Sequence, residues 1–154
     1  MKTNQGFTLL EVIAVLIIIA LLAVVAVGRL SGDHGRLDKV SDSLKSHLRF
    51  AQKMALNLER PWGIEATGSS YWLFSGNSTT HKERLPGEDE ETVGLPEPVR
   101  TDSFTICFDP DWGAPHDGTP PDKDNKLEAD KTIEVRADSQ TRVITVTPNT
   151  GFIP

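Results

Sequence analysis

The feature that most limits how this chain can fold is an apolar run from Phe7 to Val27 that contains one ionisable side chain, Glu11. At about 1.5 Å of rise per residue, a helix of roughly 21 residues reaches about 31 Å, close to the hydrocarbon thickness of a bilayer. The run therefore predicts a membrane-spanning helix over residues 7–27. The remainder of the chain is long enough for about one further domain.

A cleaved signal peptide is the alternative for this run, and "AVG" at residues 26–28 would supply its cleavage site. However, signal peptides have an apolar stretch of about 7 to 15 residues, which is shorter than this run. They also keep that stretch uncharged, because a carboxylate at the centre of an inserted helix costs about 2.5 to 3.5 kcal/mol. Glu11 lies near one end, where the cost is smaller, so a side chain that simply reaches the lipid headgroups stays open as its explanation.

The residues "KTNQGFTLLEVIAVLIIIALLAVVA" resemble the class III signal of type IV pilins and type II secretion pseudopilins. Gly6, Phe7 and Glu11 each match that pattern. The resemblance implies that residues 1–6 are a leader peptide, which a prepilin peptidase removes after Gly6 before it methylates the new amino terminus at Phe7. It also implies that the mature chain crosses the bacterial inner membrane once and displays a periplasmic, β-rich head over residues 61–154.

The same resemblance implies a role for Glu11 in assembly. In this family the glutamate pairs with the terminal amine of a neighbouring subunit, which here is the amine of Phe7. A charge pair in a low-dielectric bundle is weak evidence for stability, but a misaligned subunit would leave two charges unpaired, so the pair sets the register. The implied partners are other pilin or pseudopilin subunits, the prepilin peptidase and an inner-membrane assembly platform.

Beyond the apolar run, residues 28–60 are predicted to continue the helix in amphipathic form. Gly28, Gly32 and Gly35 weaken its start, because each costs about 1 kcal/mol relative to alanine, and they indicate either a segment that unwinds in a fibre or a hinge. Pro61 ends the helix. From residue 37 onward, apolar residues recur at the spacings of three and four that bury one helix face: Leu37, Val40, Leu44, Leu48, Ala51, Ala55 and Leu58.

After Pro61 the period of the pattern changes from 3.6 to 2, which predicts β-strands. "WGIEA" and "SYWLFS" flank the glycine-containing turn "TGSS", and "TIEVRA" and "RVITVTP" flank "DSQT" in the same way. With "SFTICF", these segments predict about five antiparallel strands. The predicted fold class is therefore α+β and pilin-like, with a small antiparallel β-sheet packed on the apolar stripe of a long N-terminal helix. The residues Trp62, Trp72 and Phe74 are expected in the core or on a sheet face.

The single cysteine, Cys107, excludes an intrachain disulfide and a zinc site built from thiols. It lies in "SFTICF", where the alternation places Phe104, Ile106 and Phe108 on one strand face and Cys107 on the other. An inert, packed thiol is the interpretation that this pattern favours.

Residues 79–102 and 109–130 show no hydrophobic period and are predicted to be polar loops. Oxygen-rich loops can bind calcium, and the resemblance adds that major pseudopilins hold calcium in their C-terminal region, although the EF-hand spacing does not occur here. No cofactor is expected, and calcium is the less favoured alternative. The histidines His34, His47, His81 and His116 lack a metal-ligand spacing. The candidate calcium ligands are Asp109, Asp111, Asp117, Asp122 and Asp124.

Within the pilin-like class, "LRFAQ" with its helix exit into a short strand and the terminal "VITVTPNTGFIP" resemble the GspH/FimT group of minor pseudopilins and minor pilins. This implies a structural subunit of a type II secretion pseudopilus or a type IV pilus, placed in the tip or initiation complex and supporting protein secretion across the outer membrane. The alternative is a minor type IV pilin whose head displays an adhesive or DNA-binding surface.

The charge distribution argues against a nucleic-acid partner. Sixteen Lys and Arg residues against 22 Asp and Glu residues give a net charge of -6, so the chain has no overall attraction to phosphate. Residues 148–154, "PNTGFIP", also lack the basic side chains through which FimT-like proteins can bind DNA. An enzyme is not predicted, because the sequence has no nucleophile elbow, HExxH or glycine-rich phosphate loop.

Overall fold

The computed structural model describes residues 9–29 and 33–154, with side chains described for residues 9–22 and 35–154. The chain divides into two compact units, and the boundary lies just before residue 35. We call residues 35–154 the head. The head contains a contiguous buried core that includes residues from its helix and from its β-strands.

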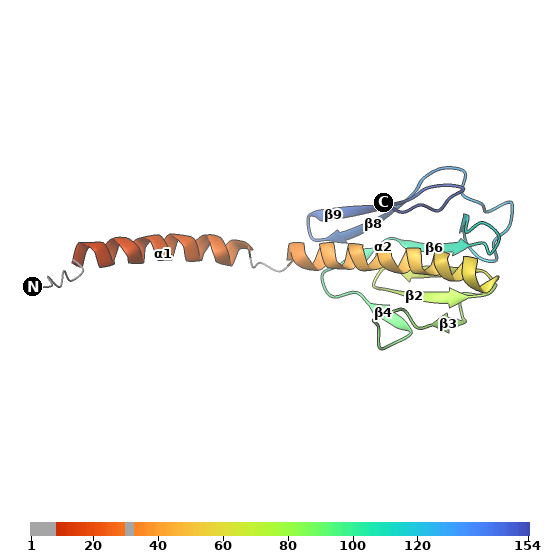
Figure 1. The fold of residues 1–154 in the computed structure, drawn as a ribbon, viewed down its shortest axis with the longest axis horizontal. Helices are drawn as coiled ribbons and strands as arrows, with labels where there is room; N and C mark the ends of the chain where they lie inside the picture. The colour runs from red at the N-terminus through yellow and green to blue at the C-terminus, as the bar shows by residue number, and fades with distance from the viewer. Residues whose placement is uncertain (1–8, 30–32) are drawn as a thin grey trace, which may run out of the picture. The chain divides into compact units, whose positions relative to one another are not determined.

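Helices α1 (Leu9–Arg29) and α2 (Asp33–Leu58) come first along the chain (Figure 1). The predicted continuation of the helix through residues 28–60 includes residues 30–32, which lie outside the described residues. Helix α2 ends at Leu58, two residues before the predicted end, because Glu59 already has the left-handed φ of 49° that is common just after a helix. Glu59 and Pro61 together turn the chain into the first strand.

The buried face of α2 follows the predicted helical period. Val40 is half-buried, and Leu58, which was expected on the buried face, is 47% exposed. Leu58 differs because it is the last residue of the helix, at the point where the chain turns away. The residues of this face that are fully buried are Leu37, Leu44, Leu48, Ala51 and Ala55.

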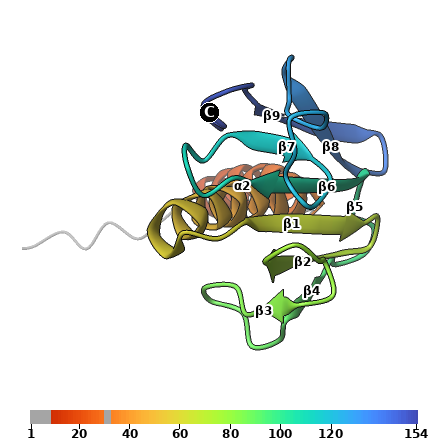
Figure 2. The ribbon, with the colours of Figure 1, turned by 90° about the vertical axis from the view of Figure 1, so that its right-hand side faces the viewer.

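Within the described residues, the strands form two antiparallel sheets. The larger sheet has the order β3-β2-β1-β6-β7, with β4 also paired to β2, and the smaller sheet has the order β5-β8-β9. Figure 2 shows β1 next to β6 in the larger sheet. The strand bounds are β1 Trp62–Thr67, β2 Ser70–Ser75, β3 Lys82–Glu83, β4 Thr92–Gly94, β5 Arg100–Thr101, β6 Ser103–Phe108, β7 Pro115–Asp117, β8 Lys131–Ala137 and β9 Gln140–Val146.

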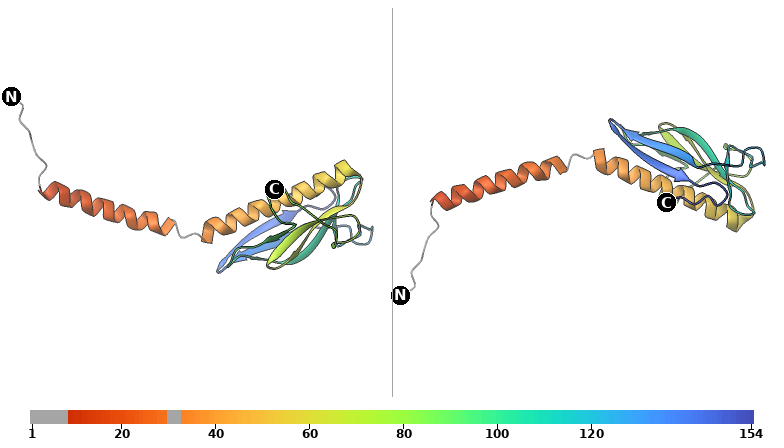
Figure 3. Two further views of the ribbon diagram at one scale, coloured as in Figure 1. Left: turned by 90° about the horizontal axis from the view of Figure 1, so that it is seen from below. Right: turned by 90° about the horizontal axis from the view of Figure 1, so that it is seen from above.

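Helix α2 lies along one side of the sheets in both views of Figure 3. The side chains that alternate toward it are apolar, with Ile64 on β1 and Ile106 on β6 opposite each other in the register. Ile133 and Ile144 are likewise opposite each other on β8 and β9, and all four are fully buried. This burial supplies the main apolar contribution to the stability of the head, at about 25 cal/mol for each Å² removed from water.

A second buried row crosses the larger sheet on the face opposite to Ile64. Phe74, Gly63, Cys107 and His116 are consecutive cross-strand partners on β2, β1, β6 and β7. Only glycine fits at position 63, because a Cβ atom on Gly63 would collide with the Phe74 ring and the Ile106 carbonyl. Burial raises the pKa of the Cys107 thiol to about 12, so the prediction of a packed, inert thiol is confirmed.

The α+β class is confirmed, and each of the five predicted strand segments forms a strand, but they are divided between two sheets. The prediction of two plain polar loops is wrong. Residues 79–102 contain β3, β4 and β5, and residues 109–130 contain β7. These strands are two or three residues long, which is too short for an alternating pattern to be visible. The two segments also contribute single apolar residues outside these strands to the core, among them Leu85, Val99 and Leu127.

Candidate assembly site

The described surface of α1 is apolar on every side. Its large apolar side chains from Leu9 to Leu22 are each between 49% and 79% exposed. A helix that is apolar all round requires an apolar environment, either lipid or other helices. The contrast with α2, whose apolar residues face its own sheets, indicates that α1 is built to be covered by something outside the head.

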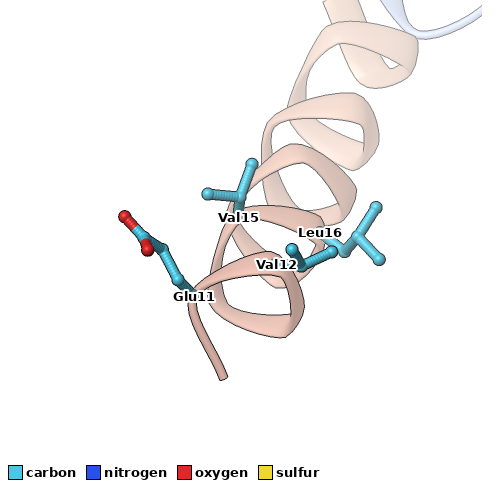
Figure 4. Close-up of a pocket in the computed structure, with 4 residues that line it drawn as sticks. All are labelled: Glu11, Val12, Val15 and Leu16. Atoms are coloured by element: carbon cyan, nitrogen blue, oxygen red, sulfur yellow. The ribbon is translucent and has the colours of Figure 1, made fainter. Parts of the chain in front are cut away.

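Glu11 is the one acidic residue in this surface among the described residues, and it lies in the first turn of α1. A carboxylate is favoured there by the partial positive charge at a helix N-terminus. The side chain is exposed. Figure 4 shows the carboxylate pointing away from the helix beside a shallow hollow between apolar side chains, which is lined by Glu11, Val12, Val15 and Leu16.

The other two predicted site residues, Gly6 and Phe7, lie outside the described residues. The implied cleavage after Gly6, the methylation of Phe7 and the pairing with Glu11 therefore stay predictions. In the described part of the chain, no helix combines the length and apolar character that crossing a bilayer requires. The membrane-spanning helix over residues 7–27 likewise stays a prediction.

The five candidate calcium ligands do not converge. Asp109 contacts His116, Asp117 forms an ion pair with Lys131 at 2.8 Å, and Asp122 accepts a hydrogen bond from the Asp124 N–H. Among the described residues, no group of three or more acidic, histidine or cysteine side chains is arranged to hold a metal ion. The calcium hypothesis is untested by this geometry, and the carboxylates Asp109 and Asp117 have partners within the protein.

The sequence analysis missed a buried polar cluster around His116. Its Nδ1 atom lies 2.9 Å from both the Asp122 carbonyl and the Asn125 Oδ1 atom, and its Nε2 atom lies 3.3 Å from an Asp109 carboxylate oxygen. The Asn125 amide is oriented by its own bonds, because its Oδ1 accepts from the Asp122 N–H and its Nδ2 donates to Pro120. Both ring nitrogens of His116 therefore face hydrogen-bond acceptors.

This cluster also contacts the carboxylate of Asp109. Burial by itself would raise the pKa of Asp109, but hydrogen bonds from the Trp112 N–H and from His116 outweigh it and hold that pKa below its usual value. The Trp112 side chain projects from the same loop and is 83% exposed. The sequence gives no signal for this cluster. The register that places His116 opposite Cys107 is known only from the structure, because it depends on β7.

Gln52 on α2 holds two further segments beside each other. Its Nε2 atom donates to the Gly113 carbonyl at 2.9 Å and to the Thr150 carbonyl at 2.7 Å. One residue after Thr150, a Cβ atom on Gly151 would collide with Gln52, so the C-terminal tail packs closely on α2. Phe152 in this tail is 61% exposed. The head thus presents exposed aromatic side chains on segments that are fixed to α2.

The comparisons with known proteins agree with the motif and the fold. The family model described as "Prokaryotic N-terminal methylation motif" matches residues 1–27. No curated protein sequence matches the chain significantly. Among solved structures, the type IV minor pilin FimU of Pseudomonas aeruginosa (strain PAO1) is similar, with a TM-score of 0.52 and 14% sequence identity over 80% of this chain and 90% of that chain.

The match to FimU is a likeness of fold, because the sequence identity is low. The head therefore has a pilin-like fold, and residues 1–27 carry a prokaryotic N-terminal methylation motif. The comparisons do not separate pilus from pseudopilus, and they do not single out the GspH/FimT group.

Proposed function

We propose that this chain is a minor pilin-type subunit that is anchored in the bacterial inner membrane by residues 7–27 and is incorporated from there into a fibre. The observation that carries the proposal is the surface of α1, which is apolar on all sides except at Glu11. Lipid covers such a helix before assembly, and the helices of neighbouring subunits cover it afterwards. The head remains in the periplasm and has no catalytic role.

In this proposal, Glu11 sets the axial position of the incoming subunit in the fibre. After cleavage behind Gly6, the methylated amine of Phe7 is a positive charge in an apolar bundle, and the Glu11 carboxylate of a neighbour is its partner. Removing one member of such a pair leaves an uncompensated charge, which costs about 3 to 5 kcal/mol when the site is buried. Misaligned subunits are rejected for the same reason.

The proposed place of the chain is the tip or initiation complex of a type II secretion pseudopilus or a type IV pilus. The fold likeness to a minor pilin and the resemblance to the GspH/FimT group support a minor position. The alternative, a head that displays an adhesive surface, is supported by one observation, the exposed Trp112 side chain on a loop whose backbone is hydrogen-bonded to Asp109. DNA binding has less support because the net charge is -6.

The test is incorporation of Glu11 variants into sheared fibres of the native host. We expect Glu11→Val to reach the membrane in normal amount but to fall tenfold or more in the fibre fraction, since about 1.4 kcal/mol is a factor of ten. Glu11→Asp should retain part of the incorporation, and Glu128→Gln, which changes an exposed carboxylate of the head, should match the wild type. Normal incorporation of Glu11→Val would contradict the proposed role.

A further inference from the structure

Strand β9 is the outer strand of the smaller sheet, whose order is β5-β8-β9, and it is seven residues long. The other edge strands in the described part of the chain, β3, β4, β5 and β7, are two or three residues long. Proteins use such short edge strands to prevent pairing with further strands. Figure 2 shows β9 on one side of the head and β3 and β4 on the other. Among the described residues, β9 is therefore the sheet edge that is long enough to accept another strand.

The hydrogen bonds of β8 show which backbone groups of β9 point outward. In an antiparallel pair, hydrogen-bonded residues alternate with residues whose N–H and C=O groups point away from the partner strand. The Glu134 N–H donates to the Asp102 carboxylate at 3.0 Å, and the Glu134 carbonyl accepts from the Asp102 N–H at 3.1 Å. The backbone of Glu134 therefore points away from β9. Val143 is opposite Glu134, so its own N–H and C=O groups point away from β8.

Every second residue of β9 has this outward orientation. Thr141 and Thr145 therefore also direct their backbone groups outward, and no described residue forms a hydrogen bond with these groups. The series ends at Thr147, whose N–H donates to the Phe152 carbonyl. The carbonyl of Thr147 accepts from the Gly151 N–H. The C-terminal tail thus closes the edge at Thr147 and leaves the part before it uncovered.

The open edge, by which we mean residues 141–145, also has side chains that favour strand pairing. Ile144 is fully buried, so the alternation of a strand places its neighbours in the open edge on the outer face of the sheet. These are Thr141, Val143 and Thr145, and Val143 is 52% exposed. Branched side chains of this kind pack well on a pleated sheet. A strand added here would cover Val143 and would supply partners for the outward backbone groups.

Charged side chains of α2 border the open edge. Asp38 forms an ion pair with Arg142 of β9. Asp42 and Lys45 follow Asp38 at the spacings that share one helix face. Asp42 is exposed and Lys45 is half-buried, and neither side chain has a hydrogen bond or ion pair with another described residue. A strand that fits beside β9 therefore carries polar or charged side chains on the side that faces α2.

The direction of β9 restricts the source of such a strand. Near the start of α2, Asp38 contacts Arg142. Near the end of α2, Gln52 donates to the Thr150 carbonyl, which lies beyond the end of β9, so β9 and α2 run in the same direction. In a two-fold dimer, β9 would pair antiparallel with its own copy, and the two α2 helices would run in opposite directions. Subunits that enter a fibre from one membrane share one direction, which favours a different subunit over a second copy.

We propose that the open edge accepts an extended strand from a neighbouring pilin-type subunit of different sequence, which adds a fourth strand to the smaller sheet when this chain enters a fibre. The outward backbone groups of Thr141, Val143 and Thr145 bind that strand, and Asp42 and Lys45 select its charged side chains. The inference rests on the proposed function, because the partner is a subunit of the same fibre.

The first experiment compares hydrogen exchange of the wild-type chain in detergent micelles and in intact fibres from the native host. In micelles, the Thr141, Val143 and Thr145 amides should exchange quickly, whereas the Ile144 amide, which faces β8, should be protected. In fibres, we expect exchange of the three outward amides to slow at least tenfold. Unchanged exchange of these amides in fibres would overturn the proposal.

Val143→Pro tests the backbone pairing. Proline lacks an N–H group, but the Val143 N–H has no partner within the head, so proline is tolerated at this edge position. We expect an unchanged denaturant midpoint and a tenfold or greater loss from the fibre fraction. Val143→Thr keeps the N–H group and is the matched control, which should be incorporated like the wild type. The exchange measurement needs no variant, so it decides the question if Val143→Pro does not fold.

The outcomes separate this inference from the proposed function. Normal incorporation of a folded Val143→Pro chain would overturn the inference alone, whereas absence of the wild-type chain from fibres would overturn the proposed function with it. The partner is identified by attaching a benzophenone to a Val143→Cys chain, in which the native Cys107 is buried and does not react. A cross-link in fibres to another subunit with an N-terminal methylation motif would support the proposal. A cross-link to a second copy of this chain would overturn it.

Discussion

Helices α1 and α2 differ in whether their apolar side chains are buried by the same chain. In α2 the apolar residues form a stripe, and most of that stripe is buried against the sheets of the same chain. In α1 the described apolar residues cover the whole circumference and are exposed. The head buries its apolar stripe within its own chain, whereas the described part of α1 leaves its apolar side chains exposed. If the proposed function holds, a substitution should therefore affect either folding of the head or assembly.

Leu44→Ala is the sharpest test of the claim that the head stabilises itself, because Leu44 is fully buried in the middle of the apolar stripe of α2. A buried leucine truncated to alanine costs about 2 to 5 kcal/mol. We expect that loss in the free energy of unfolding, measured by denaturant titration of the head signal. The control is Leu56→Ala, an exposed position on the same helix, which should cost under about 1 kcal/mol. Membrane association of both variants should stay normal, and a loss of it would break the comparison.

His116→Ala should have the next largest effect, about 2 to 3 kcal/mol, because it removes the hydrogen bonds of a buried ring to a carboxylate and to the Asp122 carbonyl. It should also raise the pKa of Asp109, which His116 helps to hold low. The depressed Asp109 pKa stabilises the head above the ordinary carboxyl range, and this contribution is lost as the pH falls through the lowered value. Acid unfolding of the variant should therefore begin at higher pH, and unfolding curves of His81→Ala should match the wild type.

A smaller effect is expected for Gln52→Ala, which removes the donor shared by the Gly113 and Thr150 carbonyls. The expected cost is about 1 to 2 kcal/mol. Hydrogen exchange of the tail amides should quicken, in particular at the Gly151 N–H, which donates to the Thr147 carbonyl. Lys53→Ala, at the adjacent exposed position, should change neither quantity. Equal effects of the two variants would show that Gln52 does not hold the tail.

The smallest effect is expected for the ion pair between Asp38 on α2 and Arg142 on β9, which are 2.6 Å apart. Both side chains are about half exposed, so water screens the pair and its coupling should be about 0.2 to 1 kcal/mol. A double-mutant cycle of Asp38→Ala and Arg142→Ala measures this coupling. It should shrink further at high salt. A coupling that salt does not reduce would mean that the packing of these side chains, rather than their charge, joins α2 to the smaller sheet.

The parts of the fold that the sequence predicts are those with long periodic patterns. Helix α2 from Leu37 and the strands of residues 62–67 and 131–137 have patterns that only one secondary structure satisfies. The short strands β3, β4, β5 and β7 could not be predicted, because their positions come from pairing with a neighbouring strand. The cluster around His116 was missed for a similar reason, since it depends on β7.

The assembly site is predictable from the sequence only in part. Glu11 is conspicuous because it is a charge in an apolar run, and its exposed position in the first turn of α1 agrees with that interpretation. The proposed partner of Glu11 is the amine of another subunit, and that pairing stays a prediction. The candidate calcium ligands form no group of three or more that could hold a metal ion among the described residues, and the calcium hypothesis stays a prediction.

The most direct test of the central claim is the mass of the N-terminal peptide of this chain from purified fibres. The account predicts a peptide that begins at Phe7 and carries one added methyl group on its amine, from a chain present in the fibre fraction. A mature chain that begins at Arg29 and is found free in the periplasm would contradict it, because such a chain has lost both Glu11 and the apolar helix.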